Sequence, residues 1–128
     1  MDGNSFSKAE RLLKPDEFRR VLKTGKRHQT RNFTLCILAN GLDRARLGIS
    51  IGVAAGGAVE RNRIKRLVRE FFRLNKGRDA IPHSSDIVIS VKKRTDLAGY
   101  RDVEEELKAA FIALTDSGAK KKPRQETP

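Results

Sequence analysis

The sequence predicts an α+β protein whose elements follow the order α-β-β-α-β-α. Two observations predict this class: apolar residues recur at helical spacing in three segments, and β-rich runs bounded by turn residues lie between them. The 128 residues fit one domain, 1–128. We expect an ordered core over about residues 11–115, with flexible polar or basic tails at 1–10 and 117–128.

The first predicted element is a short amphipathic helix that begins near Pro15. Proline suits the first turn of a helix, and the carboxylate of Asp16 complements the positive N-terminal end. Gly25 ends the helix. Its apolar stripe has the spacing i, i+3, i+4 and consists of Phe18, Val21 and Leu22.

Three strands are predicted. Residues 33–39 form a β-rich run that ends at the turn signal Asn40-Gly41, and residues 47–53 alternate apolar with small residues, so these two strands are predicted to pair antiparallel. Residues 86–91 have the composition of a buried strand. The small residues of the second strand leave one sheet face bare enough for close approach of a backbone or of another molecule; they are Gly48, Ser50 and Gly52.

Two longer helices complete the predicted order. A Gly56-Gly57 break precedes a helix over about residues 58–74, which closes at Lys76-Gly77. The last helix runs from Tyr100 and carries acidic residues in its first turns, where they suit the helix N-terminus. Its apolar stripe consists of Val103, Leu107, Ala110, Phe111 and Leu114.

The charge of the chain indicates a polyanionic partner. The sequence has 28 Lys and Arg against 16 Asp and Glu, a formal net charge of +12, whereas solubility alone needs roughly 2 to 8. Nucleic acid is the usual partner of such a protein, and an anionic membrane surface is the rarer alternative. One cysteine, Cys36, cannot form an internal disulfide, and no apolar run follows Met1, so a cytoplasmic location is expected.

The helix over residues 58–74 divides into two faces on a helical wheel. An apolar stripe of Ile64, Leu67, Val68 and Phe71 is predicted to pack on the sheet. Stacked guanidinium groups on an exposed face repel one another without a partner, and Arg binds phosphate in a bidentate manner. A solvated basic helix is the alternative, but acidic partners are sparse along this segment. The polar face consists of Asn62, Arg66, Arg69 and Arg73.

Residues 58–69 (AVERNRIKRLVR) resemble the Arg-Asn-Arg signature helix of bacterial ribonuclease P proteins. The resemblance extends over about residues 11–114. It includes Arg11-Leu12, with Phe18 and Val21 in the first helix, RLGIS at residues 46–50 and DIVI at residues 86–89.

This resemblance implies a two-layer sandwich with a mixed sheet, in which the signature helix lies in a left-handed βαβ crossover, contrary to the general right-handed rule. It also implies a subunit of an RNA endonuclease that removes the 5′ leader of precursor tRNA. The catalytic RNA and its Mg²⁺ would carry the chemistry, in a 1:1 ribonucleoprotein. This chain would hold no catalytic residue and bind no metal itself.

The resemblance assigns residues of this chain to two RNA contacts. Contact with the catalytic RNA is assigned to Arg61, Asn62, Arg63, Lys65, Arg66, Arg69 and Arg73. A cleft for the precursor leader is assigned to Arg11, Phe18, Leu22, Arg31, Cys36 and Lys92. Leu22 and Cys36 stand where relatives often carry aromatics, and residues 53–59 lack the Lys pair and the Asn that relatives often show there.

Other sites are not supported by the sequence. His28 and His83 lie far apart with no paired Cys or carboxylate at ligand spacing, so a zinc site is not expected. The sequence shows no pair of a nucleophile and a base for protein-borne catalysis. Two rival classes remain open at this point: a structural ribosomal protein and a DNA-binding architectural protein.

Overall fold

The structure is a computed structural model that describes residues 8–76, 81–92 and 97–124. In chain order it has the 3₁₀ turn η1 (Lys8–Glu10), α1 (Pro15–Thr24), β1 (Lys26–Gln29), β2 (Phe33–Ala39), β3 (Arg46–Ile51), the 3₁₀ turn η2 (Val53–Ala55), α2 (Ala58–Asn75), β4 (Ser85–Val91) and α3 (Tyr100–Arg124). The α+β class and the helices at Pro15, Ala58 and Tyr100 are confirmed.

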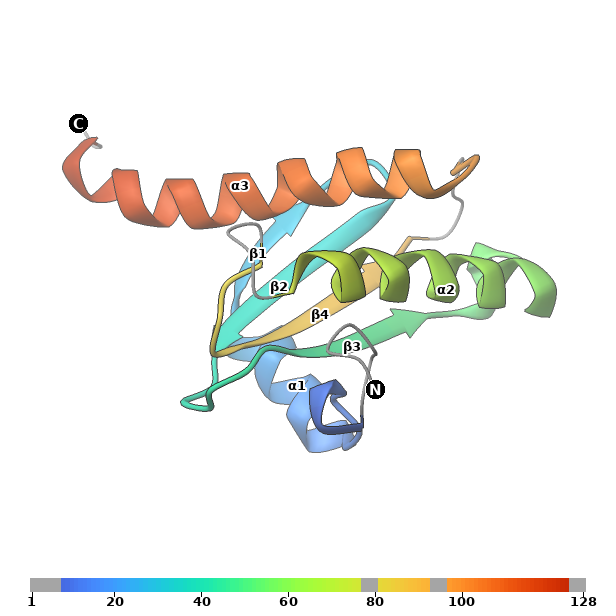
Figure 1. Cartoon of the computed structure of the whole chain (residues 1–128), viewed down its shortest axis with the longest axis horizontal. Helices are drawn as coiled ribbons and strands as arrows, with labels where there is room; N and C mark the ends of the chain where they lie inside the picture. The colour runs from blue at the N-terminus through green and yellow to red at the C-terminus, as the bar shows by residue number, and fades with distance from the viewer. Residues whose placement is uncertain (1–7, 77–80, 93–96, 125–128) are drawn as a thin grey trace.

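The four strands form one mixed sheet in the order β1-β2-β4-β3 (Figure 1). β4 pairs antiparallel with β2 and parallel with β3. The predicted antiparallel pairing of residues 33–39 with 47–53 is therefore wrong. Gly41 does turn the chain, with a φ of 71°, but β4 takes the place between the two strands. Its first five residues are buried, which suits a central strand covered on both faces.

β1 is a strand that the sequence analysis missed. Lys26–Gln29 pairs antiparallel with β2 at the sheet edge, and three of its four residues are exposed. An exposed edge strand has no hydrophobic alternation from which to predict it, and charged side chains are typical of such edges.

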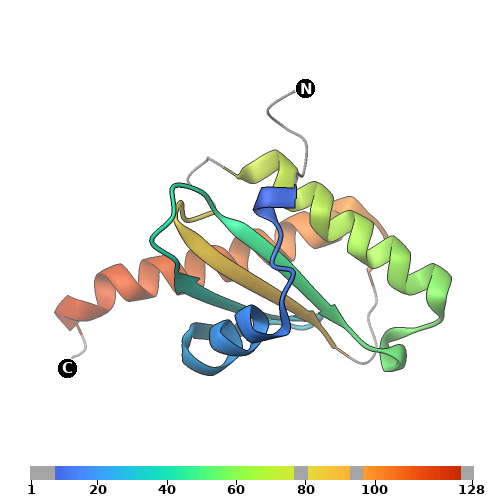
Figure 2. The same ribbon diagram turned by 90° about the horizontal axis from the view of Figure 1, so that it is seen from below.

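Helices cover both faces of the sheet (Figures 1 and 2). α2 and α3 pack on one face, whereas α1 lies on the other. The two layers that the resemblance implied are thus extended by a third, formed by α1. In Figure 1, β3 and β4 both run from left to right, α2 lies on the near side of the sheet, and β4 lies above β3. This arrangement is a left-handed crossover, as the resemblance implied.

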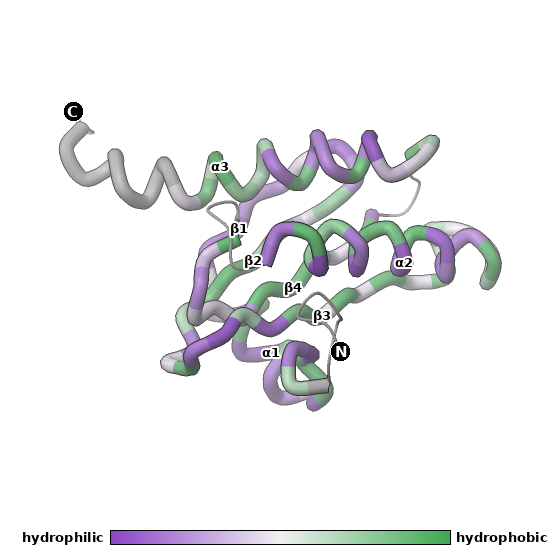
Figure 3. Tube along the Cα trace, viewed as in Figure 1, coloured by the Kyte–Doolittle hydropathy of each residue, from purple (hydrophilic) through white to green (hydrophobic). Residues whose placement is uncertain are grey.

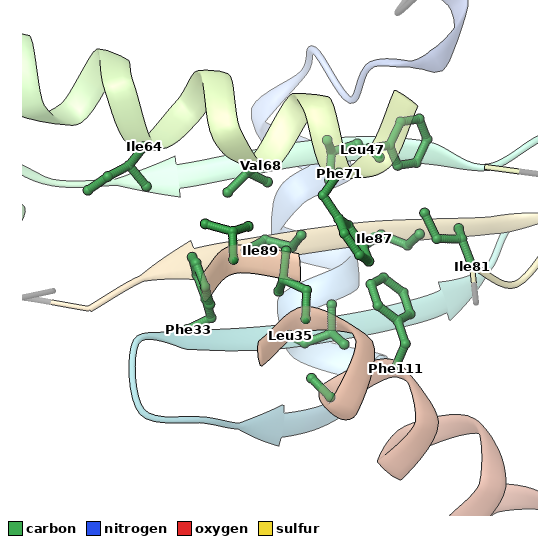
Figure 4. Close-up of a cluster of buried hydrophobic side chains, with 14 of the residues drawn as sticks. Phe33, Leu35, Leu47, Ile64, Val68, Phe71, Ile81, Ile87, Ile89 and Phe111 are labelled. Carbon is green, nitrogen blue, oxygen red and sulfur yellow. The ribbon is translucent and has the colours of Figure 1, made fainter. Parts of the chain in front are cut away.

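The main core lies between the sheet and the helix pair α2 and α3 (Figure 4). Ile64, Val68 and Phe71 of α2 have no exposed area, and the Phe71 ring stacks on Phe111 of α3 with the ring centroids 6.0 Å apart. Figure 3 shows hydrophilic and hydrophobic residues alternating along α2, as one apolar face requires. The strands contribute Phe33, Leu35, Leu47, Ile87 and Ile89 to this core.

The two ends of the chain differ from the predicted tails in part. Residues 1–7 and 125–128 lie outside the described residues. Within the described part, Lys8–Glu10 forms η1 and Lys76 pairs with Glu10, and α3 continues as helix to Arg124 rather than ending at about residue 115.

Candidate nucleic-acid interface

Because one side of α2 packs on the sheet, the opposite side of the helix is exposed to solvent. Ile64, Val68, Phe71 and Phe72 are buried against the sheet and α3. Because residues three and four apart share one side of a helix, Asn62, Arg66 and Arg69 then point away from the core, and all three are exposed. The charged residue Lys65 is half-buried beside this group.

Asn62, Arg66 and Arg69 form what we call the open side of α2. Within the described part of the chain, none of their side chains has a hydrogen bond or an ion pair. The other predicted member of the polar stripe, Arg73, differs. Its guanidinium donates to both carboxylate oxygens of Glu70, at 3.1 Å and 2.6 Å. The hydrogen bonds with Arg73 lower the pKa of Glu70 and so favour its charged form. The negative charge of Glu70 partly neutralises the positive charge of Arg73.

Two further predicted RNA contacts have partners within the protein. Arg61 Nη1 donates to the carbonyl of Gly56 at 2.9 Å, across the turn that precedes α2. Arg63 donates to both carboxylate oxygens of Glu60, at 3.0 Å and 2.9 Å, and to the carbonyls of Leu97 and Ala98. Hydrogen bonding from Arg63 lowers the pKa of Glu60. Six of the seven predicted residues thus divide into an open group of three and an engaged group of three, with the half-buried Lys65 beside the open group.

The second candidate surface lies on the α1 side of the sheet. Phe18 of α1 packs closely on Gly48 of β3, because a Cβ added at Gly48 would stand only 2.6 Å from Cζ of the ring. Gly48 admits the close approach of the Phe18 ring, so at this position the strand face is covered by α1 and not bare. Phe18 and Leu22 both remain partly exposed beside the small cluster of Leu12, Val21 and Val88.

The predicted cleft residue Cys36 is out of reach of a ligand. Its side chain has no exposed area, and it lies under Val21 of α1. Burial raises the pKa of the thiol despite the nearby Arg27 guanidinium. Cys36 therefore acts as a small apolar side chain of the buried cluster between α1 and the sheet.

Of the remaining predicted cleft residues, the structure separates Arg31 from Phe18. Arg11 is exposed, and its backbone bridges to Leu47. Lys92 Nζ donates to the carbonyl of Thr30. Arg31 lines a concavity of about 380 Å³ that it shares with acidic residues of α3, namely Asp102, Glu105 and Glu106. Since α3 and α1 lie on opposite sheet faces, Arg31 and Phe18 do not share one site.

A row of polar side chains that the sequence analysis did not assign crosses the sheet next to Phe18. The register pairs Gln29 with Thr34, Thr34 with Ser90, and Ser90 with Ser50. Thr34 and Ser90 lie two residues from Cys36 and Val88, so they face the same side as α1. All four are exposed or half-buried. We call them the polar row; the only sequence signal was the alternation of small residues in β3.

A buried ion pair fixes α1 against the sheet. The Asp86 side chain is 1% exposed and accepts hydrogen bonds of 2.8 Å from both Nε and Nη2 of Arg46 and one of 2.9 Å from Asn40. Arg46 also donates to Glu17 of α1 at 3.2 Å. Burial opposes ionisation of Asp86, but the hydrogen bonds from Arg46 and Asn40 outweigh it and lower the pKa of this carboxyl.

The described residues contain no group of three His, Cys, Asp or Glu that could hold a metal ion. None of the helices in this part of the chain is long and apolar enough to cross a membrane. What the geometry presents is a helix side whose guanidinium groups have no partner among the described residues, on a strongly basic protein. These features define an α+β nucleic-acid-binding protein.

Comparison with known proteins identifies the family. The family Ribonuclease P matches residues 6–115. The Ribonuclease P protein component of Desulforapulum autotrophicum is 43% identical over 91% of this chain and 98% of the relative, and that of Syntrophus aciditrophicus is 46% identical over 80% and 85%. The solved RNase P protein of Thermotoga maritima superposes with a TM-score of 0.65 at 39% identity, over 77% of this chain and 91% of that one. A Staphylococcus aureus RNase P protein structure gives 0.71 at 29% identity, over 84% and 96%.

The chain therefore belongs to the ribonuclease P protein family, and the resemblance predicted from the sequence is confirmed. Members of this family are protein subunits of the ribonucleoprotein that matures the 5′ end of tRNA. The chain thus has an RNA partner, the ribonuclease P RNA, and it belongs to an RNA-cleaving enzyme whose catalysis lies with the RNA subunit.

Proposed function

We propose that the open side of α2 binds the ribonuclease P RNA and that the α1 side of the sheet binds the single-stranded 5′ leader of precursor tRNA. The observation that carries the first part is the exposure of Arg66 and Arg69 without a partner in the described structure. Like charges one helical turn apart repel by a few tenths of a kcal/mol. A phosphate backbone removes this repulsion and accepts the planar guanidinium in a bidentate manner.

The leader part of the proposal is supported by the surroundings of Phe18. A partly exposed aromatic ring lies beside the polar row, whose hydroxyl and amide groups can both donate and accept hydrogen bonds. Aromatic faces that stack bases, together with nearby polar groups, are typical of single-strand binding sites. Cys36 and Arg31 are not part of this surface; Leu22 borders it.

The proposal assigns the chemistry to the RNA subunit with Mg²⁺ and gives the protein two tasks in a 1:1 complex. It screens the charge of the catalytic RNA, and it favours the precursor over mature tRNA by holding the leader. The substrate of the complex is precursor tRNA. We place the complex in the cytoplasm, as the sequence analysis expects.

Reconstitution with a bacterial ribonuclease P RNA tests the proposal. The full chain should stimulate cleavage of precursor tRNA at low Mg²⁺. The double variant Arg66→Gln/Arg69→Gln should bind the RNA more weakly, with a salt dependence shallower by about two released ions. The matched control is Lys108→Gln on α3, where the Lys108 side chain pairs with Glu104. This variant should leave the RNA affinity and its salt dependence unchanged.

Two results would contradict the proposal. The first is a protein that does not stimulate cleavage, as expected of a structural ribosomal protein that merely shares the basic composition. The second is binding to duplex DNA as strong as binding to the folded RNA, because a subunit that contacts RNA should discriminate through shape and 2′-hydroxyls.

A further inference from the structure

We propose that Arg63, an arginine of the signature helix, is a positioning residue that fastens α2 to the start of α3, rather than a contact to RNA. The inference rests on the proposed function, because it concerns how the open side of α2 is held for binding. It separates Arg63 from Arg66, which lies one helical turn further along and whose side chain has no hydrogen bond or ion pair with any residue that the structure describes.

The hydrogen bonds of Arg63 engage every nitrogen of its guanidinium group and use four of its five N–H donors. Nε and Nη2 hold the two carboxylate oxygens of Glu60, at 3.0 Å and 2.9 Å, in the planar fork geometry that Arg and carboxylate prefer. Nη2 also donates to the carbonyl of Leu97 at 2.6 Å, and Nη1 donates to that of Ala98 at 3.4 Å. Every nitrogen therefore has an acceptor inside the protein, and its side chain is only 32% exposed.

These acceptors belong to the chain segment that enters α3. Leu97 is buried in the main core. Ala98 donates its backbone N–H to Asp102 at 2.6 Å, which satisfies an N–H group at the start of α3. Glu60, Arg63, Leu97, Ala98 and Asp102 thus form a continuous clasp from the first turns of α2 to the first turn of α3.

The clasp adds polar contacts between α2 and the start of α3 to the apolar contacts of the main core, to which Ile64 and Leu97 belong. Phe71 and Phe111 stack further along α2, and the first turn of α2 has exposed residues, among them Val59 at 84%. Without Arg63 the N-terminal half of α2 would be held by fewer contacts. Binding RNA would then require ordering of the helix end that carries Asn62 and Arg66, which weakens affinity without removing a phosphate contact.

A Lys substitution distinguishes positioning from contact. Lys keeps the positive charge but presents three donors from one nitrogen, so it cannot reproduce the fork on Glu60 together with two carbonyl contacts. The experiment compares Arg63→Lys and Arg63→Gln with Arg66→Lys and Arg66→Gln in the full chain. The affinity for a bacterial ribonuclease P RNA is measured over a range of salt concentrations, at a temperature where circular dichroism shows every variant folded.

If Arg63 positions α2, both Arg63 variants lose affinity by a similar factor, about three- to ten-fold, and the salt slope stays that of the unaltered protein. Arg66→Lys keeps most of the affinity, whereas Arg66→Gln makes the slope shallower by about one ion. Thermal unfolding should also show both Arg63 variants melting earlier than both Arg66 variants.

Two results overturn the inference alone. If Arg63→Lys binds like the unaltered protein while Arg63→Gln loses one ion from the slope, Arg63 contacts RNA directly. If both Arg63 variants melt earlier but bind RNA unchanged when folded, the clasp serves stability only. If Arg66→Gln also leaves the slope unchanged, the proposed role of the open side of α2 fails, and the inference fails with it.

Discussion

The two faces of the sheet are built differently, although helices cover both. On the face of α2 and α3, large apolar side chains such as Phe33, Leu35 and Ile89 fill the interface. On the α1 face, the buried cluster is small, a buried ion at Asp86 helps to hold the helix, and the polar row stays open to solvent. One face thus supplies stability through apolar burial, whereas the other adds directed hydrogen bonds to hold its helix and leaves polar side chains open to solvent.

The largest effect that tests this comparison is expected from Asp86→Ala. The variant leaves Arg46, whose side chain is 17% exposed, without its carboxylate. Removing one partner of a buried ion pair typically costs about 3–5 kcal/mol of unfolding free energy. The remaining contact of Arg46 with Glu17 places the expected loss at the lower end. Urea unfolding followed by circular dichroism measures it, with Phe71→Ala on the other face as a control of about 3–5 kcal/mol.

The two variants should differ in their pH dependence. The folded-state pKa of Asp86 lies below its ordinary value of 3.8. A carboxyl with a lowered folded pKa stabilises the protein above the unfolded pKa, and this stabilisation is lost as the pH falls through the folded value. The loss caused by Asp86→Ala should thus be full at neutral pH and shrink below about pH 4, whereas that of Phe71→Ala should not follow this titration. A constant Asp86→Ala effect across this range would contradict the account of the α1 face.

The sequence predicted the apolar face better than the polar one. The stripe of Ile64, Val68 and Phe71 and the alternation in β3 follow from residue spacing, because apolar burial imposes periods of 3.6 and 2. β1 left no such signal, since its residues are mostly exposed. The place of β4 between β2 and β3 depends on long-range pairing, for which the local Asn40-Gly41 turn signal was misleading.

The candidate site also has features that the sequence predicted and features that it could not predict. The exposed positions of Asn62, Arg66 and Arg69 follow from a helical wheel, because the apolar stripe fixes the opposite side. The partners of Arg61 and Arg63 could not be predicted, because Leu97 lies far along the chain and all three acceptors other than Glu60 are backbone carbonyls. The polar row likewise depends on the register of four strands.

A smaller effect is expected from Phe18→Leu, which keeps apolar packing on Gly48 but removes the aromatic face. Stacking of a base on an aromatic side chain contributes about 1–3 kcal/mol in single-strand sites. The variant should lose up to that much of the preference for leader-bearing precursor over mature tRNA, measured as two binding constants in the reconstituted complex. An equal loss with mature tRNA would show that the change disturbs α1 rather than a leader contact.

The smallest effect is expected from the polar row, in the double variant Ser50→Ala/Ser90→Ala. Each hydroxyl that bonds the leader should contribute about 0.5–1.5 kcal/mol, while stability should hardly change because both side chains have exposed surface. The control is Thr115→Ala on α3, whose hydroxyl bonds the carbonyl of Phe111 and lies on the other face. Weaker binding of precursor with unchanged binding of mature tRNA would extend the leader surface from Phe18 across all four strands. If both RNAs bind as before, the α1 face holds its helix by hydrogen bonds for stability alone, and its open polar surface needs no ligand to explain it.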